Sequence, residues 1–247
     1  MSRLRSSAGD QDQGAPQLQL AVQPGGLSQP TGLVIDDGAL AGGTNQGWWS
    51  DYDDLWITPL IALQNQASRI TTYQAAFIPW MFQTEDYARA VIKGMVPDIA
   101  DHALSDRVDA RIRRQELLTK EPGPAFLALV DESALIRPVG GSQVMQHQLK
   151  RIVEIASTVP SITLQVVPLR VGVYPGLDSA FTLLEFGPAR PDLVYVENAT
   201  GSFYLEQAPI VRRYEEVLRY VLQPERALDP QRSLELIDQI GNSPNYS

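Results

Sequence analysis

Three arginines recur at helical spacing in the segment SDRVDARIRRQ, and together they could hold an anion. Arg107, Arg111 and Arg114 stand at positions i, i+4 and i+7, which places them on one face of a helix. None of them has an acidic residue three or four positions away in the same segment, and like charges at this spacing repel one another. They therefore need an anionic ligand, or carboxylates from elsewhere in the fold. A solvated helix face, or docking onto Glu132 or Glu197, is the simpler interpretation.

Carboxylates at the ends of apolar segments are the second candidate for chemistry. Glu132 follows the run AFLALV, and Glu197 closes the run LVYVE. A carboxylate turned into the protein needs a cation or several hydrogen-bond donors, which the arginines would supply. In an enzyme, Glu132, Glu197 and Tyr204 would be the residues available for acid–base catalysis. Structural ion pairs are the alternative interpretation.

An aromatic segment, FIPWMFQTEDYAR (77–89), could line a binding site. Trp80 and Tyr87 would form an apolar wall, and Gln83 places one amide within it, a composition typical of small-molecule pockets. Tyr174, in the segment VGVYPGL, is a candidate for the rim or lid of such a site. The same aromatic residues are also typical of a hydrophobic core.

Several kinds of chemistry are disfavoured by what the sequence lacks. It has no cysteine, and its two histidines, His102 and His147, have no neighbours at metal-ligand spacing. It also has no phosphate-binding glycine loop, no dinucleotide fingerprint and no nucleophile-elbow motif. We therefore expect neither a metal nor a cofactor.

Charge and hydropathy restrict the partners. The formal net charge is −9 and the pI is near 4.7, whereas nucleic-acid binding depends on basic residues that neutralise phosphates. The sequence has no apolar run long enough to cross a membrane and no N-terminal secretory signal. We therefore expect a cytoplasmic protein that binds neither nucleic acid directly nor a membrane.

Composition divides the chain into an arm and a domain. Residues 1–45 contain no aromatic residue, eight glycines and six glutamines, which predicts a flexible low-complexity arm with one candidate strand at GLVIDD. Aromatic residues begin at Trp48 and Trp49. We expect a single α+β domain over 46–242 and a short tail over 243–247.

The elements that would position the candidate residues change in type along this domain. Helices are predicted over 50–70, 84–95, 105–119, 142–158, 210–222 and 232–240, with Thr84, Ser105 and Ser142 as N-caps. Strands are predicted over 125–130, 161–169, 179–186, 192–197 and 202–206. The first two strands and the helix between them indicate a parallel βαβ unit, and the later strands are close enough to pair antiparallel. The expected fold is an N-terminal helical part packed on a mixed, mostly antiparallel sheet, followed by C-terminal helices.

A set of motifs, in order along the chain, resembles one bacterial family. The motifs are Trp-Trp at 48–49, PWMFQTEDYAR at 79–89, RIRRQ at 111–115, DESAL at 131–135, VGG at 139–141, FTLLEF at 181–186 and VYVEN at 194–198. Over about residues 48–240 they resemble the ligand-sensing-like domain of unknown function that follows a helix-turn-helix in transcriptional regulators of the xenobiotic-response-element (XRE) type, including antitoxin-like members.

The resemblance implies an effector domain that binds a small molecule, and its Arg-x-x-Arg-Gln motif adds Gln115 to the candidate residues. The family's helix-turn-helix has no counterpart in residues 1–45, so its DNA-binding role does not carry over. Two further departures are the segment 80–82, Trp-Met-Phe in place of Gly-Leu-Leu, and Gln64 and Gln66 in place of acidic residues. Both changes would make a site in this region more apolar and less negative.

The sequence thus favours a stand-alone small-molecule-binding or regulatory module, which senses a ligand or works with a separate regulator protein. The alternative is an enzyme of specialised metabolism, a lyase, cyclase or isomerase, that evolved from the same domain and needs no metal. A protein-interaction factor that uses the long arm is a third interpretation, and the helix at 210–222 is a candidate homodimer interface. The candidate ligand-binding residues are Trp80, Gln83, Tyr87, Arg107, Arg111, Arg114, Gln115, Glu132, Tyr174 and Glu197.

Overall fold

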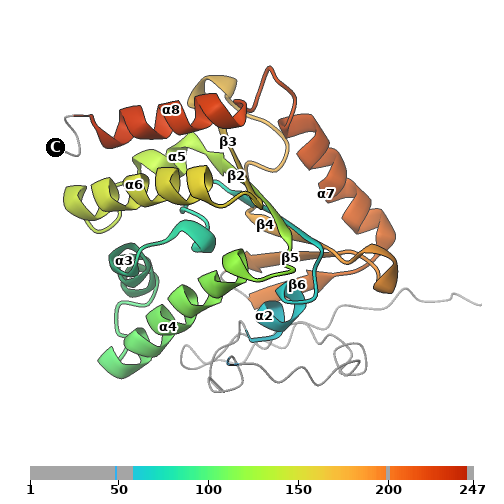
Figure 1. Ribbon diagram of the computed structural model, residues 1–247, viewed down its shortest axis with the longest axis horizontal. Coiled ribbons are helices and arrows are strands. Elements are labelled where there is room, and N and C mark those ends of the chain that lie inside the picture. The colour runs from blue at the N-terminus through green and yellow to red at the C-terminus, as the bar shows by residue number, and fades with distance from the viewer. Residues whose placement is uncertain (1–47, 49–57, 199–200, 244–247) are drawn as a thin grey trace, which may run out of the picture.

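A computed structural model describes residue 48 and the ranges 58–198 and 201–243, which form an α+β fold around one mixed sheet (Figure 1). The strand order is β3-β2-β1-β4-β5-β6. β1 (Arg69–Gln74), β2 (Ala125–Asp131) and β3 (Ile162–Val167) are parallel. The remaining strands pair antiparallel: β4 (Phe181–Glu185) with β5 (Leu193–Asn198), and β5 with β6 (Gly201–Leu205). β4 is also antiparallel to its other neighbour, β1. The predicted fold class is confirmed.

The predicted βαβ unit is formed by β2, α6 (Ser142–Thr158) and β3. Met145, Leu149 and Ile152 lie at helical spacing on α6 and are fully buried. Gly141, with φ of 90°, is the N-cap of α6, one residue before the predicted Ser142. A glycine suits this position because side chains disfavour positive φ.

Helices cover the two faces of the sheet unequally (Figure 1). α3 (Glu85–Met95), α5 (Glu132–Ile136), α6 and α8 (Pro230–Gly241) contribute to the larger core on one face. α7 (Ala208–Val221) packs on the opposite face, through Val211, Leu218 and Val221. α4 (Asp101–Arg113) packs against α3 and continues into the 3₁₀ helix η3 (Arg114–Thr119). This break ends the regular α-helix just before Arg114.

The helix predicted over 50–70 is wrong at its C-terminal end. α2 spans Thr58–Gln64, and Pro59 stands in its first turn, where a missing backbone N–H costs nothing. Arg69–Gln74 then forms β1, which pairs with both β2 and β4 near the centre of the sheet. Its sequence, RITTYQ, contains too many polar residues to form the apolar run that identifies a buried strand, although its β-branched residues suit a strand. Residues 50–57 lie outside the described ranges.

Two predicted helix starts have different outcomes. Thr84 caps α3 as predicted, because its Oγ1 accepts a hydrogen bond from the backbone N–H of Tyr87 over 3.3 Å. α4, however, begins at Asp101, so the predicted N-cap Ser105 lies inside the helix. The predicted arm (1–45), its strand at GLVIDD and residues 244–247 of the tail lie outside the described residues and stay predictions.

Candidate functional site

Arg114 is buried between two side chains that come from separate elements. Its Nε donates a hydrogen bond to Oε1 of Gln64 at the end of α2, over 2.7 Å. Its guanidinium carbon lies 4.0 Å from the centre of the Trp80 ring, in cation–π geometry. The side chain is 5% exposed, and no carboxylate within the described ranges forms an ion pair with it. Arg114 is therefore a buried cation whose nearest hydrogen-bond partner is neutral.

Three polar atoms next to this cation are buried without a hydrogen-bond partner among the described residues. They are Nε2 of Gln64, Nε1 of Trp80 and the hydroxyl of Tyr204, whose proton has no acceptor among the described residues although its oxygen lies near the backbone N–H of Leu60. A buried polar group that makes no hydrogen bond costs about 1–3 kcal/mol of stability. Native proteins keep few such groups, and each one calls for an explanation, such as a bound water or ion or a catalytic role. We call Gln64, Trp80, Gln83, Arg111, Arg114, Tyr195, Glu197 and Tyr204 the Arg114 cluster.

Charge within the Arg114 cluster is unbalanced. The pKa of Arg114 is lowered to about 9, chiefly by burial. Tyr195 and Glu197 oppose this effect, and the neighbouring cation Arg111 adds to it. This pKa still leaves Arg114 protonated at neutral pH. Burial also lowers the pKa of Arg111, and Glu197 opposes that effect. Arg111 donates to Oε1 of Gln83 over 3.1 Å, again a neutral acceptor.

The tyrosines of the cluster come from neighbouring strands. Tyr195 on β5 and Tyr204 on β6 are cross-strand partners, with ring centres 5.1 Å apart. The Tyr195 hydroxyl donates to Glu197 over 2.9 Å, so the 2.9 Å bond with Ser202 has the serine as donor. Burial raises the pKa of both Tyr195 and Tyr204 above the ordinary tyrosine value. Both hydroxyls thus stay protonated at neutral pH and act as donors rather than as bases.

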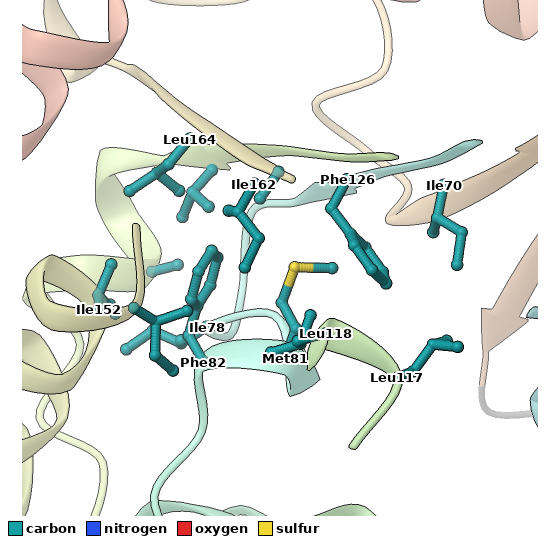
Figure 2. Close-up of a cluster of buried hydrophobic side chains, with 14 of the residues drawn as sticks. Ile70, Ile78, Met81, Phe82, Leu117, Leu118, Phe126, Ile152, Ile162 and Leu164 are labelled. Carbon is teal, nitrogen blue, oxygen red and sulfur yellow. The ribbon is translucent and has the colours of Figure 1, made fainter. Parts of the chain in front are cut away.

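The aromatic segment ahead of α3 divides between core and cluster. Met81 and Phe82 are fully buried, and Figure 2 shows both side chains pointing toward the sheet residues Phe126 and Ile162. Trp80 is only partly buried, packs edge-on against Phe126 at 6.2 Å and presents its face to Arg114. The segment is therefore core at two positions, and at the third it forms one wall of the Arg114 cluster.

Glutamines hold this segment in place. Gln83 donates to the carbonyl of Ile78 over 2.7 Å, and Gln115 donates to the carbonyls of Trp80 (3.1 Å) and Gln83 (2.7 Å). Gln148 on α6 is fully buried; it donates to the carbonyl of Phe82 and accepts from the N–H of Thr84. Gln115 is thus a positioning residue for Trp80 rather than a residue whose amide faces Arg114.

A second polar cluster lies at the carboxyl end of β2, on the opposite face of the sheet. Tyr174 is buried there; its hydroxyl donates to Oδ2 of Asp131 over 2.5 Å and contacts the Tyr73 hydroxyl at 2.9 Å. Burial raises the pKa of Tyr73 to about 12 and that of Tyr174 still further. Asp131 also accepts from the N–H of Ser133. These hydrogen bonds attach the segment after β3 to the sheet.

The structure therefore separates the sequence-predicted residues into groups. Trp80, Gln83, Arg111, Arg114, Glu197 and Tyr204 gather in the Arg114 cluster, and Arg107 lies close enough to lower the pKa of Arg111. Tyr87 is fully buried, and its hydroxyl accepts from the N–H of Ile78. Tyr174 and Glu132 lie elsewhere, and a Glu132 carboxylate oxygen accepts from the N–H of Leu169 over 2.8 Å.

Two members of the cluster are absent from the predicted set. Gln64 is fully buried against Arg114, whereas Gln66, the other glutamine that replaces an acidic family residue, is exposed. The polar Gln64 at the end of an apolar helix was the available signal. Tyr195 lies in the apolar strand LVYVE, where nothing in the sequence distinguishes it from a core tyrosine.

Other kinds of site find no support in the described ranges. Within 48, 58–198 and 201–243 no group of three or more metal-ligating side chains is clustered. No helix in those ranges is long and apolar enough to cross a lipid bilayer.

The fold and the Arg114 cluster together define an α+β domain in which a buried arginine, without an ion-pair partner among the described residues, lies beside an aromatic ring. The chain belongs to the family described as a domain of unknown function, DUF5753, which matches residues 57–239. This match covers every element of the Arg114 cluster and all six strands. No curated protein and no solved structure matches the chain significantly.

Proposed function

We propose that this domain is a small-molecule-binding regulatory module, and that the Arg114 cluster is its binding site. The observation that carries the proposal is the group of three unpartnered polar atoms around a buried arginine, within the described residues. A small molecule that hydrogen-bonds to these atoms removes part of the cost of burying them. The regulatory role is the expectation that comes from the resemblance to the effector domains of XRE-type regulators.

Coupling between the site and the rest of the fold follows from the positions of its residues. Gln64 ends α2, Arg114 begins η3, Trp80 begins the 3₁₀ helix η2 (Trp80–Phe82) and Tyr204 lies on β6. A ligand that contacts all four residues would bridge four elements and stabilise their packing. It would thereby change which surface the domain presents to a regulator protein.

The alternative function, an enzyme without a metal, draws on one pair of residues. Glu197 accepts a hydrogen bond from Tyr195 beside Arg111 and Arg114, so one carboxylate, one hydroxyl and two cations lie together. Such a group could transfer a proton and stabilise negative charge. The raised tyrosine pKa values argue against Tyr204 as a base, because its hydroxyl keeps its proton at neutral pH.

The indole N–H of Trp80 is a direct reporter for the proposal. In a ¹H–¹⁵N spectrum, Trp80→Phe identifies the signal among those of the four tryptophans. A deproteinised extract of the producing cells should move this signal downfield, because the unpartnered N–H gains an acceptor.

Two matched variants make this experiment decisive. Arg114→Gln should remove the response, whereas Arg151→Gln, at an exposed ion pair on α6, should keep it. If the extract leaves the Trp80 signal unmoved while the protein is folded, the proposed site is refuted.

A further inference from the structure

The charges in the Arg114 cluster restrict the ligand that fits. The charged neighbours that act on Arg114 are Arg111 and Glu197. Among the described members of the cluster, two guanidinium groups and one carboxylate leave one positive charge in excess. Glu197 is exposed, whereas Arg114 is buried, so solvent screens the carboxylate more than it screens the cation. A single negative charge on the occupant would restore neutrality, whereas a dianion would reverse the excess.

The polar atoms without partners also favour a ligand that carries hydrogen-bond acceptors. The amide nitrogen of Gln64 and the indole nitrogen of Trp80 are donors only. Nε of Arg114 is engaged by Gln64, and no described residue accepts a hydrogen bond from its two terminal nitrogens. Tyr204 keeps its proton and adds a fourth donor. An occupant of this site must therefore offer acceptors, and several of them must lie close together.

The aromatic side chains of the cluster indicate what the rest of the ligand should be. The guanidinium carbon of Arg114 lies 4.0 Å from the centre of the Trp80 ring, so an acceptor that reaches its terminal nitrogens would lie next to that aromatic surface. A carboxylate matches the paired donors of a guanidinium, because its two oxygens accept two parallel hydrogen bonds. Tyr195 and Tyr204 add aromatic surface from the sheet. Aromatic walls favour a planar apolar body next to that carboxylate.

We infer that the Arg114 cluster recognises a small monocarboxylate with a planar, apolar body. The carboxylate accepts hydrogen bonds from Arg114, Gln64 and Trp80, and the body stacks among the aromatic side chains. This inference rests on the proposed function, since it names the ligand class of the same site.

The test uses simple probes and thermal unfolding at constant ionic strength. Benzoate and phenylacetate are the carboxylate probes, benzamide is the uncharged isostere of benzoate, and inorganic phosphate represents a multiply charged anion. A ligand that binds only the folded state raises the melting temperature with its concentration. The two carboxylates should give saturable increases at millimolar concentration, at least tenfold more potently than benzamide or phosphate.

Gln64→Glu is the decisive variant, and Gln66→Glu is its matched control. The new carboxylate of Gln64→Glu would occupy the place of Oε1, 2.7 Å from Nε of Arg114, and would neutralise the cation from within. This variant should stay folded and lose the response to benzoate. Gln66→Glu adds the same charge two residues away on an exposed side chain and should keep the response.

The outcomes separate this inference from the proposed function. If benzoate and phenylacetate stabilise wild type no more than benzamide does, or if Gln64→Glu responds as wild type does, the monocarboxylate inference is overturned. In that case, a response of the Trp80 indole signal to cell extract still supports the proposed function with a ligand of another class. If the extract also leaves that signal unchanged, both are overturned.

Discussion

Nε of Arg114 and Oε1 of Gln64 are 2.7 Å apart, although the two residues are separated by 50 positions in the sequence. This bond joins the end of α2 to the start of η3 and fixes one edge of the guanidinium. It also gives a buried cation a neutral acceptor, where a carboxylate is the usual partner of a buried charge. The amide nitrogen of Gln64 is left without a partner among the described residues.

Replacing Gln64 by Glu should therefore stabilise the protein in the absence of ligand. The new carboxylate would pair with Arg114 and remove the unpartnered amide nitrogen, and we expect a gain of about 1 kcal/mol or more in the free energy of unfolding. Urea denaturation at pH 7 measures it, with Gln66→Glu as the control that should change stability little. A Gln64→Glu protein less stable than this control would show that Arg114 does not lack a counterion.

Gln148 should be needed to hold the aromatic segment against α6. Its amide bonds to the carbonyl of Phe82 (2.7 Å) and to the N–H of Thr84 (2.8 Å), and it is fully buried. Gln148→Met keeps the size of the side chain but leaves both backbone groups unpaired, which should cost about 2–4 kcal/mol. Gln143→Met, on the exposed side of the same helix, should change the unfolding free energy little. Equal effects of the two substitutions in urea denaturation would contradict this role.

The hydroxyl of Tyr174 should stabilise the segment that follows β3. Tyr174→Phe removes a donor to the buried carboxylate of Asp131 and leaves the ring in place. Hydrogen bonds to charged groups contribute about 1.5–3 kcal/mol, so the loss should fall in that range. The control is Tyr220→Phe on α7, where the residue is 38% exposed. If hydrogen exchange of residues 169–178 does not become faster in Tyr174→Phe than in the control, the attachment is refuted.

Stability should depend on pH through Glu185. Burial raises its pKa above the ordinary value of 4.5, and the nearby Arg69, with its Nε 3.6 Å away, only partly opposes this. Because the folded-state pKa is raised, the protonated form contributes stability below pH 4.5, and this contribution is lost as the pH rises through the folded pKa. Glu185→Gln should therefore be more stable than wild type at pH 7, and the difference should shrink at pH 3. The opposite trend in urea midpoints would mean that the pair with Arg69 dominates.

Much of the fold could be predicted from the sequence because its strongest signals are local. The helix over 142–158 and the strands that flank it follow from apolar periodicity and length, and all three are present. β1 escaped prediction because Thr71, Thr72 and Gln74 interrupt its apolar pattern. Its burial comes from pairing with β2 and β4, which are distant in the sequence, so no local pattern encodes it.

The candidate site was predictable only in part, for a similar reason. The arginine spacing predicted carboxylate or anionic partners, whereas Arg111 and Arg114 donate to the neutral side chains of Gln83 and Gln64. Helix geometry alone could not tell that Arg114 turns inward at the start of η3. Gln64 and Tyr195 come from other parts of the chain, and only the tertiary fold brings them to Arg114. Tyr174, predicted at the rim of a site, is instead buried beside Asp131 on the other face of the sheet.

Native mass spectrometry tests the central claim, that the Arg114 cluster binds a small molecule, most directly. Wild type, Arg114→Gln and the control Arg151→Gln are purified gently from the producing cells and measured first under native and then under denaturing conditions. We expect wild type and Arg151→Gln to carry a small molecule that is released on denaturation, and Arg114→Gln to lack it. If all three folded proteins have the mass of the bare chain, or if Arg114→Gln retains the molecule, the account is contradicted.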